Sequence, residues 1–304
     1  MDNMFQDLIE RARKGGPRRL VCILPGREED IACIRQAADA GLVHPVFIGA
    51  SAECARVLPA EVHPAAVCEV IDAPDAGAVL SAALRLMREG RGDILMQGAC
   101  EQQFFFDAVC RKGSGLMRDS LVSYQSLFRP GGGRKAFIIT DSYIHNYPSL
   151  REKQHIVTQA LELARVLDIE APKVAALAAI EQVNTKIQST VDSAILSKMS
   201  ERGQFGDAVI DGPIDIDCAL TRSAARRKGL TSLVTGDVDI YLVPDVESGY
   251  SFVEMLAFIG RMPAIGVLMG TVKPVILTVP FVLQQHRVAE IALASLINHA
   301  ENAQ

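Results

Sequence analysis

The sequence predicts an α/β protein in which parallel strands are covered by helices, and three observations support this class. Short apolar runs alternate with longer helical patterns along almost the whole chain, which is typical of repeated β–α units. Aromatic residues make up only 5% of the chain and tryptophan is absent, so aliphatic side chains must fill the core, as in strands buried on both faces. The 304 residues are enough for two domains of ordinary size.

The first part of the chain predicts four strands connected largely by helices. Strands are expected at residues 20–24, 45–48, 67–71 and 93–96, and helices at residues 1–18, 28–40, 76–89 and 101–112. Pro25-Gly26 ends the first strand. Gly41 is expected to end the second helix, because glycine readily adopts the left-handed conformation found there.

The pattern changes near residue 121. Two extended runs, 121–128 and 135–140, flank the turn Pro130-Gly131-Gly132-Gly133, which predicts a β-hairpin. We expect the junction between two domains here. The alternative is a surface hairpin inside a single domain.

The rest of the chain again alternates between helices and strands. Helices are expected at 149–168, 189–202, 222–228, 248–259 and 283–297, and strands at 173–180, 208–210, 239–243, 264–268 and 275–278. Ser149 and Glu152 have the spacing of a capping box, in which each side chain bonds the other residue's backbone N–H. This predicts a helix start at Ser149.

Composition and absent motifs exclude several classes of function. The net charge of −5 argues against a global basic field, so no nucleic acid is expected as a partner. Residues 1–18 carry several charges and predict an amphipathic helix, so no signal peptide is expected, and no apolar run approaches the roughly 20 residues of a membrane span. The seven cysteines form no C-x-x-C pair and indicate reduced thiols, so we expect a cytoplasmic protein without membrane contact. G-x-S-x-G, P-loop and G-x-G-x-x-G motifs are missing, which argues against serine hydrolases, P-loop NTPases and ordinary Rossmann dehydrogenases.

Candidate binding residues follow the strands, because ligands of open α/β sheets collect at the carboxyl ends of the strands. The segments concerned are Gln97-Gly98, 211–213, 244–249 and 278–280. Glu247-Ser248-Gly249 opens a helix whose free backbone amides favour an anion. Ser248 has an alternative role as the N-cap of that helix. We therefore expect a small anionic ligand.

No metal site is proposed from the sequence. Asp211, Asp215 and Asp217 alternate, but they lack the ligand spacing of a calcium loop and are also explained by turn formation and helix capping. The histidines are scattered without ligand spacing. Among basic residues, Arg118 follows Gly115-Leu116-Met117, and its guanidinium matches the geometry of phosphate.

Six segments of the chain carry a family resemblance. They are residues 38–42, 45–49, 170–177, 208–213, 236–244 and 247–249. Asp211-Gly212-Pro213 followed by Gly236-Asp237-Val238-Asp239 is fairly specific as a combination. With these motifs the chain resembles the phosphate acetyl/butyryltransferase family, and especially its shorter phosphate butyryltransferases, from about residue 20 to its end.

The resemblance implies a fold and a reaction. The fold is the two-domain α/β/α arrangement of isocitrate and isopropylmalate dehydrogenases, with a cleft between the domains and a C-terminal segment that returns to the first. We expect the first domain at residues 1–128 plus 274–304 and the second at 129–273. The implied reaction is acyl-CoA plus phosphate giving acyl phosphate plus coenzyme A, with a short acyl group. The implied partners are these ligands and a second copy in a homodimer. Coenzyme A is a substrate, and no bound cofactor is expected.

The resemblance also implies roles for individual residues. Arg118 and Thr278 are expected to be catalytic, Arg118 as a phosphate contact and Thr278 as the remaining hydroxyl on the last strand. Seven residues are expected to bind substrate: Asn184, Lys186, Asp211, Gly212, Glu247, Ser248 and Gly249.

The chain departs from the family at the end of the last strand. The family has Thr-Ser-Arg followed by an Asp, whereas this chain has Thr278-Val279-Pro280 and no Asp follows. Met-Lys-Gly becomes Met96-Gln97-Gly98, and Asn-Pro-Lys becomes Asn184-Thr185-Lys186. Loss of a single charge-stabilising donor typically costs about a hundredfold in rate, so weakened activity is expected. Two alternatives stay open: a paralogue that binds acyl-CoA or acyl phosphate as a sensor or subunit, and an enzyme for another phosphate-bearing substrate.

Overall fold

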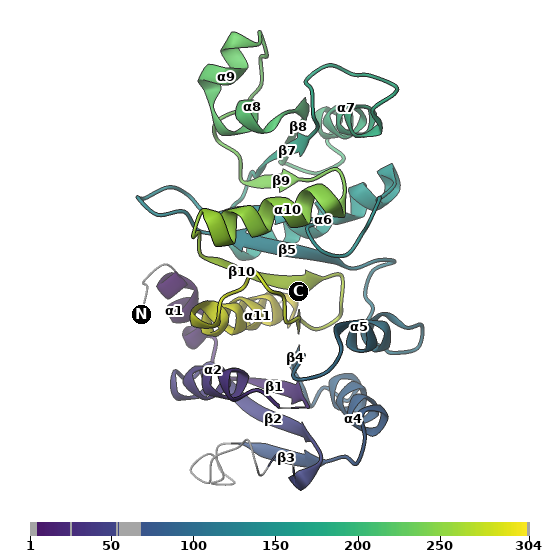
Figure 1. The fold of residues 1–304 in the computed structure, drawn as a ribbon, viewed down its shortest axis with the longest axis vertical. Helices are drawn as coiled ribbons and strands as arrows, with labels where there is room; N and C mark the ends of the chain where they lie inside the picture. Colours follow the sequence, from purple (N-terminus) through teal and green to yellow (C-terminus); the bar gives the residue numbers. More distant parts are fainter. Residues whose placement is uncertain (1–4, 25, 53, 55–67, 303–304) are drawn as a thin grey trace. The chain divides into compact units, whose positions relative to one another are not determined.

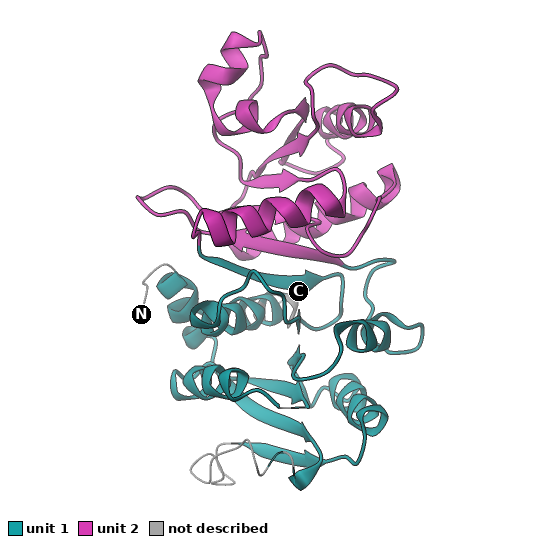
Figure 2. Ribbon diagram, in the orientation of Figure 1, with its two compact units in different colours: residues 1–122, 263–304 teal, residues 123–262 magenta. Residues whose placement is uncertain are grey.

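The chain folds into two compact units (Figure 2). The computed structural model describes residues 5–302 except 25, 53 and 55–67. Unit 1 comprises residues 1–122 and 263–304, and unit 2 comprises residues 123–262. Both boundaries lie earlier than the expected positions 129 and 274. The reason is that the strand at 123–128 pairs within unit 2, whereas the strand at 264–269 pairs within unit 1.

Unit 1 is built around strands from both ends of the chain (Figure 1). Its strands are β1 (Arg18–Ile23), β2 (Val43–Gly49), β3 (Glu69–Asp72), β4 (Ile94–Met96), β10 (Ala264–Met269) and β11 (Val275–Ile276). Its helices are α1 (Gln6–Lys14), α2 (Glu28–Asp39), α4 (Ala76–Arg88), α5 (Gln102–Cys110), the short η4 (Gln284–His286) and α11 (Arg287–Asn302). The strand order is β3-β2-β1-β4-β11-β10, and only β10 runs antiparallel to its neighbour β11.

The core of unit 1 explains why its strands are continuous apolar runs. Leu20 and Cys22 of β1 belong to one cluster with Ile34 of α2 and Ile291 of α11. Val21, between them, is also fully buried. Alternate residues of a strand point to opposite faces, so β1 is covered on both sides and has no polar face.

Unit 2 is a continuous segment of the chain. Its strands are β5 (Ser123–Phe128), β6 (Phe137–Thr140), β7 (Lys173–Leu177), β8 (Val209–Ile214) and β9 (Ile240–Leu242), in the order β5-β6-β9-β7-β8. Its helices are α6 (Leu150–Val166), α7 (Gln188–Glu201), α8 (Ile216–Leu220), α9 (Arg222–Arg227) and α10 (Val246–Glu254), which continues into the π-helical turn η3 (Met255–Ile259). β5 and β6 are antiparallel, and the other pairs in this series are parallel.

The mixed α/β class predicted from the sequence is confirmed, as are two local predictions. The hairpin places Phe128 opposite Phe137, and the capping box of Ser149 and Glu152 begins α6. Among the described residues, no helix is both long and apolar enough to cross a membrane.

Several element boundaries were predicted wrongly: the last helix is α11, which begins at Arg287 and not at 283, β7 ends at Leu177 and not at 180, and α1 ends at Lys14 and not at 18. Two further errors concern segments predicted to bind substrate. β8 was expected to end at residue 210, but it continues to Ile214, so the Asp-Gly-Pro motif lies inside the strand. α10 was expected to begin at Ser248, but Asp245 is its N-cap. Residues 1–4 of the predicted first helix and residue 67 of the predicted third strand lie outside the described residues.

Candidate active site

A cavity of 530 Å³ lies in unit 1 where β1, β4 and β11 end. These three strands are parallel, so their carboxyl ends meet at one edge of the sheet, where ligands of such folds bind. Its polar and charged lining residues are Arg27, Glu29, Asp30, Gln97, Gln102, Thr278, Gln284 and Arg287. Val279 and Pro280 line it as well. The cavity therefore contains the segment in which this chain departs from the family that it resembles.

Thr278 is held by the neighbouring strand end. Its backbone N–H donates to Gln97 Oε1 at 3.0 Å, and its hydroxyl donates to the Gln97 carbonyl oxygen at 3.4 Å. The Gln97 side chain is buried and also donates to the Cys100 carbonyl oxygen. The ends of β4 and β11 are thus fixed to each other, and the Thr278 hydroxyl is oriented rather than free to rotate.

A buried charge cluster lies behind Thr278. The Arg287 guanidinium contacts Glu290 Oε2 at 2.9 Å, Asp30 Oδ1 at 3.4 Å and the Thr278 hydroxyl at 3.4 Å. All three charged groups are almost fully buried. Burial raises the pKa of Glu290 to about 7, although Arg287 acts in the opposite direction. Arg287 is therefore committed to protein groups and supports Thr278 from behind.

Arg27 is one of the cavity residues that were not predicted from the sequence. Its side chain is 43% exposed, and its contacts with protein groups are long: 3.4 Å to the Gly98 carbonyl oxygen and 3.7 Å to Asp30 Oδ2. Its position directly after the Pro25-Gly26 strand stop was the available signal, because such residues lie at the carboxyl edge of the sheet.

The structure does not bring Arg118 into this cavity. Its guanidinium forms two hydrogen bonds with Asp119, at 3.2 and 3.1 Å, and its backbone N–H donates to Gly270. The adjacent Met117 forms a bridge with Thr271 in the same unit. Of the two residues predicted to be catalytic, Thr278 lines the cavity and Arg118 does not.

In unit 2, the predicted substrate residues Asp211 and Gly212 lie within β8. A Cβ on Gly212 would lie 2.6 Å from the Ala176 carbonyl oxygen and 2.9 Å from Ser193 Cβ, so β7 and α7 require a glycine here. Asp211 Oδ1 accepts hydrogen bonds from the Gly212 N–H and the Ser197 hydroxyl. Both residues therefore have structural roles in holding β8 against its neighbours.

Asn184 and Lys186 lie in the loop between β7 and α7. Asn184 Oδ1 accepts a hydrogen bond from the Lys186 N–H at 3.0 Å, and the Asn184 N–H donates to Thr190 Oγ1 at 2.9 Å. These bonds form a turn that leaves the Lys186 side chain exposed. The exposed ammonium is available to an anion.

Glu247, Ser248 and Gly249 form the first turn of α10. Asp245 caps this helix, and its carboxylate accepts the Ser248 N–H at 2.8 Å. Glu247 accepts a hydrogen bond from the Tyr147 hydroxyl at 3.1 Å. A Cβ on Gly249 would lie 2.7 Å from Val243 Cγ2, so glycine lets α10 approach β9 closely.

Ser248 lines a 750 Å³ cavity of unit 2 together with the buried ion pair of Lys153 and Asp192. The pair is joined at 2.8 Å, and both side chains are almost fully buried. The other six predicted substrate residues are not among its described lining residues. Pro244 and Asp245, from the candidate segment 244–249, line it beside Ser248.

Asp141, directly after β6, is another residue that was not predicted from the sequence. Its carboxylate accepts the backbone N–H groups of four residues, namely Tyr124, Tyr143, Ile144 and His145, at 3.1–3.2 Å. Burial raises the pKa of Asp141, whereas His145 and the backbone donors favour its ionised form. Its role is to organise the loop after β6.

One acidic group among the described residues has the spacing of metal ligands. It consists of Glu181, Asp215, Asp217 and Cys218, whose ligand atoms lie within 4.8 Å of one another. The Lys228 ammonium contacts all three carboxylates and thereby supplies a positive charge to the group. Asp211, predicted to share this run, is not part of it.

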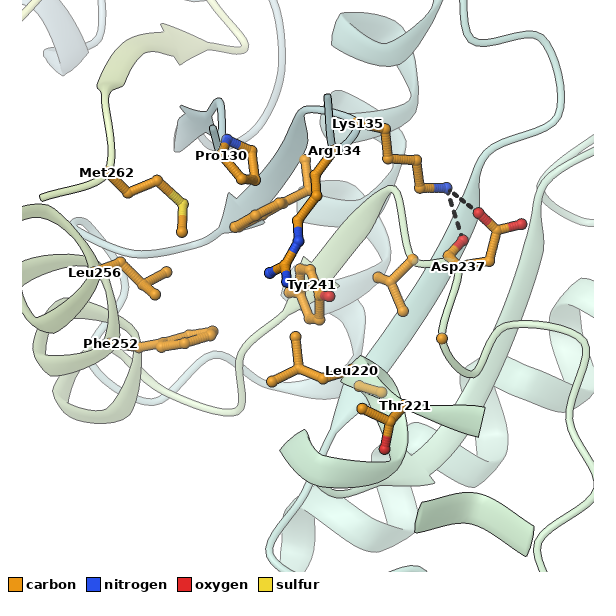
Figure 3. A pocket seen from close by; sticks show the side chains of 14 residues that line it. Pro130, Arg134, Lys135, Leu220, Thr221, Asp237, Tyr241, Phe252, Leu256 and Met262 are labelled. Carbon is orange, nitrogen blue, oxygen red and sulfur yellow. Dashed lines mark hydrogen bonds and ion pairs between the residues drawn. The ribbon is translucent and has the colours of Figure 1, made fainter. Parts of the chain in front are cut away.

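A further cavity, of 710 Å³, lies at the amino ends of β6 and β9 (Figure 3). Tyr241 and Phe252 are among the apolar residues that line it, and Arg134 points into it. Lys135 contacts Asp237 at 2.7 Å, and Lys135 and Lys173 lower the pKa of Asp237 to about 2. No predicted site residue lines this cavity, which lies at the opposite end of the strands from Asp141.

Comparison with known proteins gives one consistent family. Residues 73–295 match the family model described as phosphate acetyl/butaryl transferase. The chain is 32% identical to a phosphate acetyltransferase from Rhizobium meliloti over 292 residues, covering 96% of this chain and 92% of that protein. It is 30% identical to a phosphate butyryltransferase from Clostridium beijerinckii over 297 residues, covering 98% of both.

Solved structures show the same fold. A branched-chain phosphotransacylase from Enterococcus faecalis superposes with a TM-score of 0.80 at 23% identity, covering 92% of this chain and 99% of that one. A phosphotransacetylase from Streptococcus pyogenes gives a TM-score of 0.81 at 18% identity, covering 97% and 99%. None of these relatives supports the sensor alternative.

Proposed function

Because this chain belongs to the phosphate acetyl/butaryl transferase family, a family of enzymes, we propose that it transfers a short acyl group between coenzyme A and inorganic phosphate. The reaction is acyl-CoA plus phosphate giving acyl phosphate plus coenzyme A. The observation that carries the proposal is the match to named acyltransferases over nearly the whole length of both chains.

The protein accelerates this reaction mainly by positioning the two reactants and by stabilising charge. Inorganic phosphate has a second pKa of about 6, so a dianionic nucleophile is abundant at neutral pH. The departing thiol has a pKa of about 8.5 and leaves readily as the thiolate. Holding the two reactants together and stabilising the developing oxyanion then provide most of the acceleration. The reaction can therefore tolerate a change in which residue supplies each donor.

The residues proposed for this reaction are those expected from the sequence. Thr278 is proposed to contact the reacting groups, since its hydroxyl is oriented in the unit 1 cavity. Arg118 is proposed as a phosphate contact. Asn184, Lys186, Asp211, Gly212, Glu247, Ser248 and Gly249 are proposed to shape the substrate site. Among them, the exposed Lys186 has the charge to hold a phosphate of coenzyme A.

The proposed setting is a cytoplasmic homodimer with acyl-CoA, acyl phosphate and phosphate as its small-molecule partners. Coenzyme A is a substrate in this scheme, and no resident cofactor is proposed. Large apolar side chains that are exposed in unit 2 support the dimer, among them Leu233, Phe258 and Ile259, because exposed apolar surface favours association.

The test is an assay of phosphate-dependent release of coenzyme A from acetyl-, butyryl- and branched-chain acyl-CoA. Release that requires phosphate and is matched by acyl phosphate formation is expected. The mass of the same preparation in solution, by light scattering, tests the dimer. Binding of acyl-CoA without turnover of any of the three would contradict the transferase proposal.

A further inference from the structure

The unit 1 cavity lacks the donors that its family places at the end of the last strand. Val279 is buried and has an apolar side chain, and Pro280 has neither a backbone N–H nor a charge. A phosphate that binds at this strand end therefore needs a cation from another element.

Two guanidinium groups line the cavity, and they differ in availability. Arg287 is 3% exposed, and its nitrogen atoms are held by Asp30, Glu290 and Thr278. The Arg27 side chain is 43% exposed, and its ion pair with Asp30 is long, at 3.7 Å. Solvent and a ligand can reach Arg27, whereas Arg287 would have to break buried contacts, which is costly.

The sheet brings Arg27 to the same edge as Thr278. β1 and β11 lie on either side of β4, and both run parallel to it. Two neighbouring strand spacings amount to about 10 Å, a gap in which a small anion can contact residues from both strand ends. Arg27 follows β1, and Thr278 and Pro280 follow β11.

We infer that Arg27 binds phosphate in the unit 1 cavity, which Arg118 does not line, so that the cation lost at the end of β11 is supplied from the end of β1. Its planar guanidinium can donate two parallel hydrogen bonds to phosphate oxygens. The inference rests on the proposed acyltransferase function and names the residue that recognises its phosphate. Glu29 lines the same cavity, and its negative charge opposes the bound anion.

The test is a pair of variants with opposite expected signs. Arg27→Gln is expected to raise the KM for phosphate about tenfold to a hundredfold, the loss typical of one charged hydrogen-bonding partner. Glu29→Gln is expected to lower the KM for phosphate, because it removes repulsion. A general loss of folding cannot raise the KM for phosphate in one variant and lower it in the other. Arg35→Gln, an exposed arginine on α2, is the matched control and should leave the KM unchanged.

A second, independent experiment returns the positive charge to position 280. Adding Pro280→Arg to Arg27→Gln is expected to recover much of the phosphate affinity, because the guanidinium returns to the strand end where the family carries it. Arg27→Lys is expected to lie between the natural protein and Arg27→Gln, since an ammonium keeps the charge but loses the fork.

Thermal stabilisation by inorganic phosphate separates this inference from the proposed function. A ligand that binds the folded state raises its stability, whether or not turnover occurs. Phosphate should raise the melting temperature of the natural protein and of Arg35→Gln, and should do so much less for Arg27→Gln. If phosphate stabilised the natural protein but not Arg27→Gln, and no turnover occurred, the result would contradict the acyltransferase proposal but support phosphate binding by Arg27. An Arg27→Gln variant with unchanged phosphate stabilisation and unchanged KM would overturn the inference.

Discussion

At the scale of single residues, Glu290 gives the stability of this protein a dependence on pH. Burial raises its pKa to about 7, well above the value near 4.3 expected for an unfolded chain. A carboxyl group with a raised folded-state pKa favours folding fully below its unfolded pKa, and this contribution is lost as pH rises through about 7. The natural protein should therefore lose stability between about pH 4.5 and pH 7 from this group, by a few kcal/mol at most.

Glu290→Gln tests this dependence without emptying the site. The amide has nearly the same shape and does not titrate in this range, but it keeps one acceptor oxygen where Glu290 offers Oε1 to the Gly266 N–H and Oε2 to Arg287. The variant is therefore compared with itself at two pH values. Urea unfolding at pH 5 and pH 8 should show a smaller loss of stability for the variant than for the natural protein. If both proteins lost the same free energy of unfolding between pH 5 and pH 8, Glu290 would be ionised throughout this range.

The residues that the sequence analysis missed depend on distant partners. Arg287 and Asp30 are separated by 257 positions in the sequence, and nothing in either local segment indicates their contact. Asp141 is bound by backbone N–H groups, which every non-proline residue has, so its partners leave no trace in the sequence. Thr278 was found because it ends an apolar strand, and the same rule would have found Arg27 at the end of β1.

At the scale of elements, the start of α6 provides a direct measurement of a cap. The Ser149 hydroxyl accepts the Glu152 N–H, and the Glu152 carboxylate accepts the Ser149 N–H at 2.7 Å. Ser149→Ala removes the first of these bonds and is expected to cost about 1 kcal/mol in the free energy of unfolding. Thr158→Ala, on the exposed face of the same helix, is the control and should stay within about 0.5 kcal/mol. An equal effect of both substitutions in urea titrations would show that the cap contributes nothing.

Elements were predictable where the signal is local and less so where packing decides. The capping box and the glycine-rich turn between β5 and β6 are local, and both were found where the sequence places them. The end of β8 was missed because Asp211-Gly212-Pro213 has turn-forming residues, yet Gly212 is needed for close packing against Ala176. Asp245, not Ser248, caps α10, since either residue type suits a cap and the sequence alone does not choose between them.

At the scale of the whole molecule, we expect neither folding nor substrate binding to depend on a metal ion. The acidic group of Glu181, Asp215 and Asp217 is contacted by the Lys228 ammonium, which places a cation where an ion would bind. Addition of EDTA to purified protein should leave the melting temperature and the phosphate stabilisation unchanged. A fall in melting temperature that one divalent ion restores would contradict this expectation.

The α/β class of the molecule could be predicted because it depends on patterns repeated along the whole chain. The bounds of the two units could not, because they depend on which neighbour each strand joins. The hairpin was a natural place for a junction in the sequence, but both of its strands belong to unit 2. Likewise, the run at 264–268 is short and apolar, and nothing within it indicates that it pairs with β11 and belongs to unit 1.

The insertion of unit 2 between the two segments of unit 1 has a consequence for synthesis on the ribosome. β4 is complete at Met96, but its partner β11 begins only at Val275. At about 5–20 residues per second, the nascent chain waits on the order of ten to forty seconds with that edge of β4 unpaired. Unit 2 is continuous and can fold during this interval, whereas the N-terminal part of unit 1 must avoid aggregation until the C-terminal segment emerges. We therefore expect unit 2, the middle of the chain, to fold first in the cell. Unit 1, which contains both ends of the chain, is expected to complete its folding last.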